Sequence, residues 1–223
     1  MENETMVRGE VSFQVFSRQS VLFDLLGCAV KRTLDIILSL FGLILVSPVF
    51  LLVALIVKLD SKGPVFYVSK RVGLGGKHFA MMKFRSMVQD ADARKKDLLH
   101  LNERDKVLFK ISNDPRITRV GGFLRRYSLD ELPQLLNVLF GDMSLVGPRP
   151  CLPTEFVQYT NKQRRRSLVR PGITGLWQVR ARRSSSLATY FAMDLFYVDN
   201  WSLALDVKIL FQTVSVVLAG SGS

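Results

Sequence analysis

The sequence predicts an α+β fold, in which a mainly helical domain holds a small β-hairpin and is attached to a membrane by one long apolar helix. Three observations predict it. Residues 34–57 are almost uninterrupted apolar sequence, residues 65–84 have the strand, turn and strand pattern of a hairpin, and residues 89–107, 132–139 and 201–219 have helical patterns. The 223 residues leave room for one ordinary domain and an appendage, but are few for two domains with separate cores.

The composition combines a membrane signal with a strong positive charge. Hydrophobic residues make up 48% of the chain and the mean hydropathy is +0.19, while the net charge of +12 indicates an anionic partner such as nucleic acid, anionic lipid or a phosphorylated substrate. Two distant cysteines, Cys28 and Cys151, cannot build a disulfide framework or a Cys-rich zinc site, and His78 and His100 cannot supply a His-rich one. A catalytic metal would therefore need oxygen ligands, which favours magnesium.

The chain divides into three parts. Residues 1–30 lack a signal-peptide pattern, because charges such as Arg18 and Asp24 interrupt each apolar run, and are predicted to form an amphipathic or partly ordered lead-in. Residues 31–62 form the predicted membrane helix. Residues 63–223 form the predicted domain, which lies on the membrane.

The apolar segment 34–57 is long enough to cross a bilayer, but two features indicate that it turns back. As a helix it would reach about 36 Å, against a hydrocarbon core of roughly 30 Å. Ser47 and Pro48 lie at its middle, where proline removes a backbone hydrogen bond and bends the helix. Both flanks are basic, which places both ends in the cytoplasm by the positive-inside rule; these flanking residues are Lys31, Arg32, Lys58 and Lys62. An ordinary single span remains the alternative from these cues, because transmembrane helices tolerate proline.

The later segments have simpler interpretations. Glycines at 73–76 lack the following Lys-Ser/Thr of a phosphate-binding loop and are interpreted as the hairpin turn. Residues 89–107 are predicted to be a solvated helix and residues 132–139 a short buried one. Residues 201–219 indicate an amphipathic helix on the membrane surface or on the domain, rather than a second span.

A basic stretch covers residues 161–183, which hold eight Lys and Arg side chains and no acid. Such a stretch attracts phosphates, and beside a membrane anchor it also attracts anionic headgroups. The alternative is a solvated basic surface that only holds the protein on the leaflet.

Two adjacent acids, Asp130 and Glu131, are the strongest candidates for chemistry. Flanked by Arg125 and Arg126, they can hold a divalent cation and a phosphate together, which is what phosphoryl transfer requires. The structural alternative is a capping box that starts at Ser128, with the acids in the first turn of a helix.

Downstream of the acids, Pro148 and Pro150 enclose Arg149. Two prolines restrict the backbone on both sides of the arginine and limit the directions in which its guanidinium can point. A rigid arginine suits the recognition of a phosphate or nucleotide.

Taken together, the motifs resemble the bacterial sugar transferase family, the monotopic polyprenyl-phosphate phosphoglycosyl transferases. The resemblance runs from about residue 31 to the C-terminus. The strings that carry it are Lys31 to Asp35, Ser47-Pro48, Lys83 to Met87, Ser128 to Gln134, Gly141 to Ser144, Val146 to Pro150 and Arg170 to Gly175.

The resemblance implies a re-entrant membrane helix bent at Ser47-Pro48 and a role for each candidate residue. Asp130 would be the nucleophile and Glu131 its partner, and both would bind Mg²⁺. Three arginines would bind the phosphates or nucleotide of the donor, with Pro148 and Pro150 around the second; they are Arg125, Arg149 and Arg182. The sequence Arg180-Ala181-Arg182 departs from the Asn-Gly-Arg that is frequent in the family, which weakens the assignment of Arg182.

The implied reaction transfers a sugar 1-phosphate from a UDP-sugar to undecaprenyl phosphate, or to another polyprenyl phosphate, and releases UMP. It would initiate bacterial polysaccharide or glycoconjugate synthesis through a covalent aspartyl-phosphosugar intermediate. The expected place is the cytoplasmic face of the bacterial inner membrane. The expected partners are the donor, the acceptor lipid and membrane lipids, without nucleic acid.

Two other functions stay open from the residues. One is a non-enzymatic, membrane-tethered basic binding protein; the other is a transferase that acts at the anomeric carbon and releases a nucleoside diphosphate. Residues 194–198 and 201–203 resemble members that transfer glucose or galactose phosphate, but they do not identify the sugar. The sequence also leaves open the pathway, a homo-oligomer, and whether the chain is a minimal form or the catalytic part of a longer one.

Overall fold

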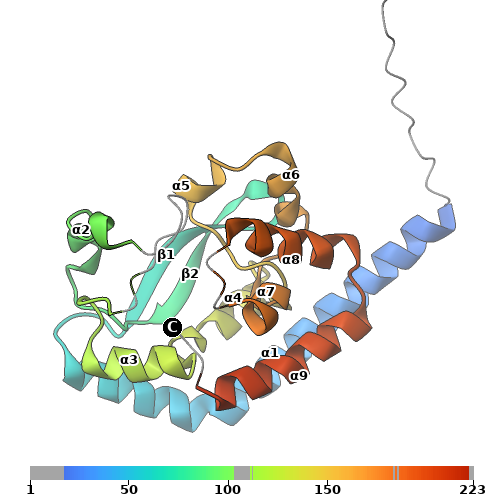
Figure 1. The fold of residues 1–223 in the computed structure, drawn as a ribbon. Helices are drawn as coiled ribbons and strands as arrows, with labels where there is room; N and C mark the ends of the chain where they lie inside the picture. The colour runs from blue at the N-terminus through green and yellow to red at the C-terminus, as the bar shows by residue number, and fades with distance from the viewer. Residues whose placement is uncertain (1–17, 103–110, 112, 183, 185, 221–223) are drawn as a thin grey trace, which may run out of the picture.

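A computed structural model describes residues 18–102, 111, 113–182, 184 and 186–220. Helix α1 (Arg18–Asp60) is 43 residues long and lies along one side of the remaining chain (Figure 1). Its segment Leu26–Asp60 is the one helix, within the described residues, that is long and apolar enough to cross a membrane. Of the predicted lead-in, residues 1–17 are outside the described part, and α1 already begins at Arg18.

The predicted hairpin is confirmed. Strands β1 (Phe66–Val72) and β2 (His78–Phe84) pair antiparallel, and the turn η1 (Leu74–Gly76) joins them. Gly75 and Gly76 have φ angles of 62° and 79°, which are the left-handed conformation that glycine adopts without a steric penalty. The glycines are therefore turn residues.

A second, parallel sheet was not predicted. Strands β3 (Ser144–Val146) and β4 (Gly172–Thr174) pair in parallel and are three residues long each. Their backbones approach so closely that a Cβ at Gly172 would lie 2.1 Å from the nitrogen of Gly147, and one at Gly147 would lie 2.4 Å from the carbonyl of Arg170. Only glycine allows this approach.

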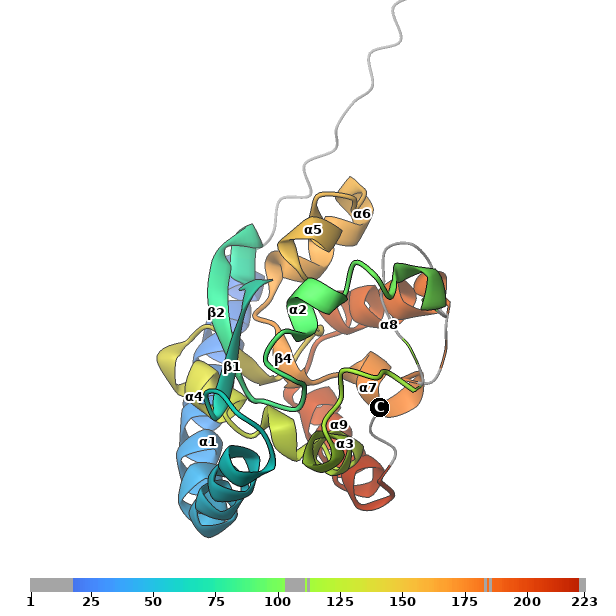
Figure 2. The same cartoon turned by 90° about the vertical axis from the view of Figure 1, so that its left-hand side faces the viewer.

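Most of the other helices lie to one side of the hairpin, which stands at an edge of the molecule in Figure 2. These other helices are α2 (Ala91–Arg94), α3 (Arg119–Arg126), α4 (Gln134–Phe140), α5 (Pro153–Phe156), α6 (Asn161–Arg164), α7 (Leu176–Arg180), α8 (Leu187–Asp199) and α9 (Leu203–Leu218). The 3₁₀ turns besides η1 are η2 (Leu99–Leu101), η3 (Leu129–Glu131) and η4 (Arg165–Leu168).

Two of the three predicted helices are confirmed in outline, and one is wrong. Helix α4 occupies the predicted 132–139 segment with bounds shifted by one or two residues, and α9 occupies 201–219. The predicted helix 89–107 is instead the four-residue α2, a turn region and η2, with residues 103–107 outside the described part. Its many charges left it without a continuous apolar face to pack, and packing rather than propensity stabilises most helices in proteins.

Helix α9 carries apolar side chains both on the face that packs on the domain and on its exposed face. Ile209 is fully buried, while Val207, Phe211, Val214 and Leu218 are exposed at spacings of four and three residues. The exposed residues therefore form one apolar stripe along the helix.

Helix α1 bends, and its two halves run in different directions in Figure 1. Pro48 lies inside the helix and cannot donate a hydrogen bond to the carbonyl of Ile44. The hydroxyl of Ser47 donates to that carbonyl at 2.8 Å instead. The Ser-Pro pair thus allows a bend while the freed carbonyl keeps a partner.

The C-terminal half of α1 packs against the hairpin and α3. Val53 and Val57 form a buried cluster with Phe84 of β2 and Leu124 of α3. The buried guanidinium of Arg85 donates to the carbonyls of Val57, Ser61 and Pro64, around the end of the helix. Arginine at a helix C-terminus satisfies carbonyls that have no partner within the helix.

The N-terminal half of α1 contacts the same domain. Lys31 donates to Asp206 of α9 at 2.6 Å, and Arg32 donates to the carbonyls of Val138 and Leu139 at the end of α4. Asp35, which is 4% exposed, accepts the backbone N–H of Leu145 in β3. Both ends of the long apolar helix are therefore fixed to one folded unit.

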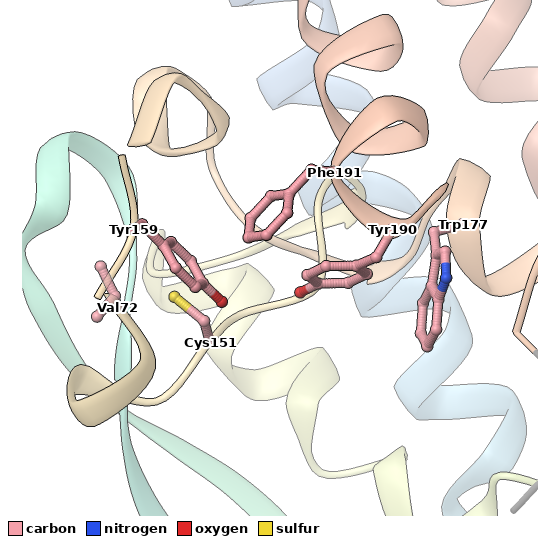
Figure 3. Packing of buried hydrophobic residues seen from close by; sticks show 6 residues of the cluster. All are labelled: Val72, Cys151, Tyr159, Trp177, Tyr190 and Phe191. Carbon is pink, nitrogen blue, oxygen red and sulfur yellow. The ribbon is translucent and has the colours of Figure 1, made fainter. Parts of the chain in front are cut away.

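A second buried cluster is mainly aromatic (Figure 3). Its buried residues are Val72, Cys151, Tyr159, Trp177, Tyr190 and Phe191. The rings of Tyr159 and Phe191 meet edge to face at 4.8 Å, and those of Trp177 and Tyr190 at 5.0 Å. Such pairs add about 0.5–1.5 kcal/mol each to the effect of burial.

Two adjacent glycines of α3 provide a test of the fold. A Cβ at Gly121 would lie 2.0 Å from the carbonyl oxygen of Ser86, so Gly121→Ala forces two backbones apart and should lower the free energy of unfolding by roughly 1–3 kcal/mol or more. At Gly122 the nearest atom is a methyl of Ile117 at 3.8 Å, so Gly122→Ala should raise it by about 0.5–1 kcal/mol. Thermal unfolding of both variants in detergent measures the difference, and equal shifts would contradict the packing of α3 on Ser86.

Candidate active site

The two candidate acids lie in η3, between α3 and α4. Asp130 is 7% exposed, and the side chain of Glu131 is 12% exposed. Ser128 has a φ of 56°, the left-handed conformation that is uncommon outside glycine, and its side chain makes no capping hydrogen bond. The capping-box alternative is therefore wrong. Helix α4 starts only at Gln134, with Pro133 before it, so the proline costs no helical hydrogen bond.

Glu131 is tied to two cations. Lys83 of β2 donates to its Oε1 at 2.6 Å, and Arg149 donates to the same oxygen at 3.3 Å. Lys83 Nζ lies 3.9 Å from Oδ2 of Asp130, beyond hydrogen-bond distance. The lysine thus stands between the acids but bonds to only one of them.

This difference in contacts separates the acidities of the two carboxyls. Burial raises the pKa of Asp130, and the charge of Glu131 adds to that rise while Lys83 opposes it. Burial would also raise the pKa of Glu131, but Lys83 and then Arg149 outweigh it and hold the pKa below its ordinary value. Burial lowers the pKa of the Lys83 ammonium, against the attraction of Glu131 and then Asp130. The pKa of Glu131 is therefore shifted down and that of Asp130 up, so Asp130 is the more basic carboxylate of the pair.

Arg149 is held by its backbone on a rigid loop. Four successive carbonyls accept hydrogen bonds from three segments: Pro148 from the N–H of Gly172, Arg149 from Arg166, and Pro150 and Cys151 from the adjacent β1 residues Arg71 and Val72. Pro148 and Pro150 are buried, whereas the Arg149 side chain is 36% exposed. The loop is thus fixed while the guanidinium stays accessible to a substrate.

The other two predicted arginines lie around the same acids. Burial lowers the pKa of Arg125, at the end of α3, and the charge of Asp130 acts against that effect. Burial also lowers the pKa of Arg182, the charge of Arg149 adding to this and Glu131 opposing it. The Arg182 guanidinium donates to the hydroxyl of Ser128 at 3.4 Å. All five charged residues predicted from the sequence therefore gather at one place.

Two cations of this site were missed. Lys83 belonged to a motif string without an assigned role, and Arg71 of β1 was not singled out. Both line a small pocket, whose residues are Arg71, Met81, Lys83, Glu131, Gln134, Arg149, Pro150 and Gly172. A usable signal was present in β2, where Lys83 stands directly before the core residue Phe84 and follows four apolar residues.

The basic stretch 161–183 does not form a single anion-binding surface. Arg165 pairs with Asp199 on the surface, Arg166 is buried against Asp194, and Arg170 donates to the carbonyl of Gly141. Of the residues described in this stretch, Arg182 is the one placed beside the acids. Much of the positive charge therefore supports the fold.

The acids can hold one divalent cation together with a phosphate. The described residues contain no group of three or more His, Cys, Asp or Glu side chains that could enclose a metal. Mg²⁺ does not need one, since it keeps several waters and binds through one or two carboxylates plus phosphate oxygens. Both side-chain donors to Glu131 use Oε1, so a cation would draw its protein ligands from Asp130 and from Glu131 Oε2.

The charge balance of the site favours a polyanion. Four cationic side chains, those of Lys83, Arg125, Arg149 and Arg182, act on the two carboxylates, which leaves a surplus of positive charge. Arg71 lines the same pocket, with Glu155 as its acidic neighbour. A diphosphate, carrying two or more negative charges, would match that surplus. The arrangement can therefore bind a diphosphate and present a buried carboxylate to it.

Comparisons with known proteins agree with this chemistry. The chain is 42% identical over 202 residues to the exopolysaccharide production protein ExoY of Sinorhizobium fredii, covering 89% of each chain. It is 46% identical over 200 residues to the undecaprenyl-phosphate galactose phosphotransferase of Salmonella typhimurium, covering 86% of this chain and 41% of that one. It is also 44% identical over 192 residues to the UDP-glucose:undecaprenyl-phosphate glucose-1-phosphate transferase of Klebsiella pneumoniae, covering 82% and 39%. Because the profile of the bacterial sugar transferases matches residues 26–220, the chain belongs to this enzyme family.

Proposed function

We propose that this enzyme transfers a sugar 1-phosphate from a UDP-sugar to undecaprenyl phosphate, forming a lipid diphosphosugar and UMP as the first step of a bacterial polysaccharide or glycoconjugate. One observation carries the proposal. Of two adjacent buried carboxylates, Glu131 is bound by Lys83 and Arg149, while Asp130 lies beside them under a surplus of arginines. The names of the Salmonella and Klebsiella relatives, which state this class of donor or acceptor, support it.

The proposed chemistry has two steps at one phosphorus atom. The Asp130 carboxylate attacks the sugar-bearing phosphorus of the donor, the bond to the UMP oxygen breaks, and a glycosyl-phospho-aspartate forms. A phosphate oxygen of the polyprenyl phosphate then attacks the same phosphorus and releases the carboxylate. A carboxylate is a weak nucleophile, so the donor charge must be neutralised before the attack, which is the role of Arg125, Arg149 and Arg182.

Asp130 and Glu131 would also hold Mg²⁺ in this proposal. A bound Mg²⁺ supplies charge neutralisation on the diphosphate oxygens. Lys83 fixes Glu131 in its ionised form and keeps a positive charge next to the attacking carboxylate.

The proposed location is the cytoplasmic face of the inner membrane, with α1 entering and leaving on that side. The contacts at both of its ends support this, since Lys31, Arg32 and Asp35 bind the same domain as Val53 and Val57. A straight span would separate its ends by the membrane thickness. Most of the remaining apolar side chains of α1 are exposed, as expected of a lipid-facing surface.

The reaction class is tested by identifying the nucleotide that leaves. A panel of UDP-sugars with undecaprenyl phosphate and Mg²⁺ should yield UMP and a lipid diphosphosugar. Release of UDP instead would indicate transfer at the anomeric carbon and would contradict the proposal.

Asp130→Asn should lower turnover by roughly 10³-fold or more without unfolding the protein, because it keeps the shape of the side chain but removes the nucleophile. Without acceptor, the wild-type enzyme with donor and Mg²⁺ should gain the mass of one sugar phosphate, and hydroxylamine should remove it. Asp90→Asn, a surface acid paired with Arg94, serves as the control and should behave as the wild type. If Asp130→Asn still gains the adduct, Asp130 is not the nucleophile.

Lys83→Met should lower kcat/KM for the donor by about 10²–10³-fold, the usual cost of removing one positive group from a preorganised transition-state site. Lys70→Met removes a lysine from the neighbouring strand, where it is exposed, and should leave kcat/KM near the wild-type value. Equal activity of the two variants would show that Lys83 takes no part in the reaction.

Cysteine labelling in intact cells tests re-entry. In a Cys28→Ser background, Val30→Cys and Asp60→Cys should both resist an impermeant external reagent and react once the cells are permeabilised. Adding Ser47→Ala and Pro48→Leu should straighten α1 and make one of the two ends reactive from outside. External labelling of either site in the unstraightened protein rules out re-entry.

A further inference from the structure

The most enclosed ion pair of the described residues lies behind the active-site loop rather than in it. Arg166 of η4 donates to Oδ2 of Asp194 in α8 at 2.5 Å, and their side chains are 3% and 1% exposed. Neither residue reaches the acids of η3. The proposed reaction gives this pair no chemical step.

The guanidinium of Arg166 is clamped by aromatic rings. Its central carbon lies 4.6 Å from the ring centre of Tyr190, 5.7 Å from that of Tyr159 and 5.9 Å from that of Phe191. These three rings belong to the aromatic cluster of Figure 3. Rings around a planar cation attract it and restrict its rotation.

The clamped guanidinium also reaches the active-site loop. The nitrogen that binds Asp194 donates to the backbone carbonyl of Arg149 at 2.6 Å. A chain of contacts thus runs from Asp194 through Arg166 and the Arg149 backbone to the Arg149 guanidinium, which binds Glu131. Both neighbours of Arg149 are prolines, which have no backbone N–H, so Pro148 and Pro150 make their backbone hydrogen bonds through their carbonyls.

We propose that Arg166, oriented by Asp194, is a positioning residue for Arg149. It holds the carbonyl of Arg149 so that the accessible guanidinium points at Glu131 and at the donor diphosphate; this inference rests on the proposed function of Arg149. A buried ion pair is a poor source of stability compared with apolar side chains of the same volume. We therefore assign the pair a role in directing Arg149 rather than in stability.

The test replaces the pair by apolar residues and compares stability with activity. Arg166→Met with Asp194→Leu removes both charges and leaves methionine among aromatic rings, so the midpoint of thermal unfolding should stay within about 5 °C of the wild type. The kcat/KM for the UDP-sugar should nevertheless fall at least about tenfold, because the carbonyl of Arg149 loses its donor and the guanidinium shifts. Arg165→Gln with Asp199→Asn, which removes the exposed ion pair next to it in the chain, should change neither quantity.

A double-mutant cycle shows whether the effect passes through Arg149. In an Arg149→Ala background, Arg166→Met with Asp194→Leu should cost less than about twofold further in kcat/KM, since the residue it positions is already gone. If the apolar pair does not fold, Arg166→Lys enters the same cycle, because it keeps a charge beside Asp194 but lacks the planar group that the rings of Tyr159, Tyr190 and Phe191 hold in place.

Three results would overturn the inference: wild-type kcat/KM in the folded apolar variant, wild-type kcat/KM in Arg166→Lys, or an undiminished loss in the Arg149→Ala background. The test of this inference can be told apart from the test of the proposed reaction. The identity of the released nucleotide tests the reaction, whereas the cycle measures donor consumption and tests the coupling of Arg166 to Arg149 whichever nucleotide leaves.

Discussion

The contact of Glu131 with Lys83 and Arg149 is the constraint on which the arrangement of this domain depends. A buried carboxylate without cationic partners is costly, so the three segments that carry these residues must meet in one geometry. Lys83 comes from the hairpin, Glu131 from a 3₁₀ turn and Arg149 from the loop after β3. The close glycine packing of β3 on β4 and the four bonded carbonyls of the loop bring Arg149 to that meeting point. The positive charge that these contacts do not neutralise can then act on a bound substrate.

Much of the positive charge of the chain supports the fold, and only part of it is available for the proposed substrate binding. Arg32 and Arg85 donate to carbonyls at the ends of α4 and α1, Arg170 to that of Gly141, and Arg166 to that of Arg149. A guanidinium presents five donors in a fixed plane and suits such multiple carbonyl contacts. The net charge of +12 therefore overstates the size of the anion-binding surface, as the dispersal of residues 161–183 shows.

Sequence reasoning succeeded where a signal was local and periodic. The apolar run of α1, the hairpin with its glycine turn, and α9 were predicted, and the motif strings indicated Asp130, Glu131 and Arg149. It failed where the decisive partner was remote. The role of Lys83 depends on its contact with Glu131, 48 positions away. The three-residue strands β3 and β4 were not predicted, because they pair two remote segments and no local pattern reveals that pairing. The capping box failed for a local reason, since Ser128 adopts a left-handed conformation that a sequence pattern does not show.

Helix α1 and the candidate active site are connected through two short elements, α4 and β3. Arg32 caps α4, whose first residue follows Glu131 by three positions, and Asp35 binds the N–H of Leu145 in β3, four positions before Arg149. Arg32 and Asp35 lie in one turn of α1, so the segments that carry the two acids and Arg149 are both attached to that turn. Under the proposed re-entry, the depth of α1 in the leaflet sets the distance of both Asp130 and Arg149 from the membrane surface. It does not change the distance between the two residues. A polyprenyl phosphate held in the leaflet and a donor arriving from water could then meet at a site whose internal geometry stays the same when α1 moves in the bilayer.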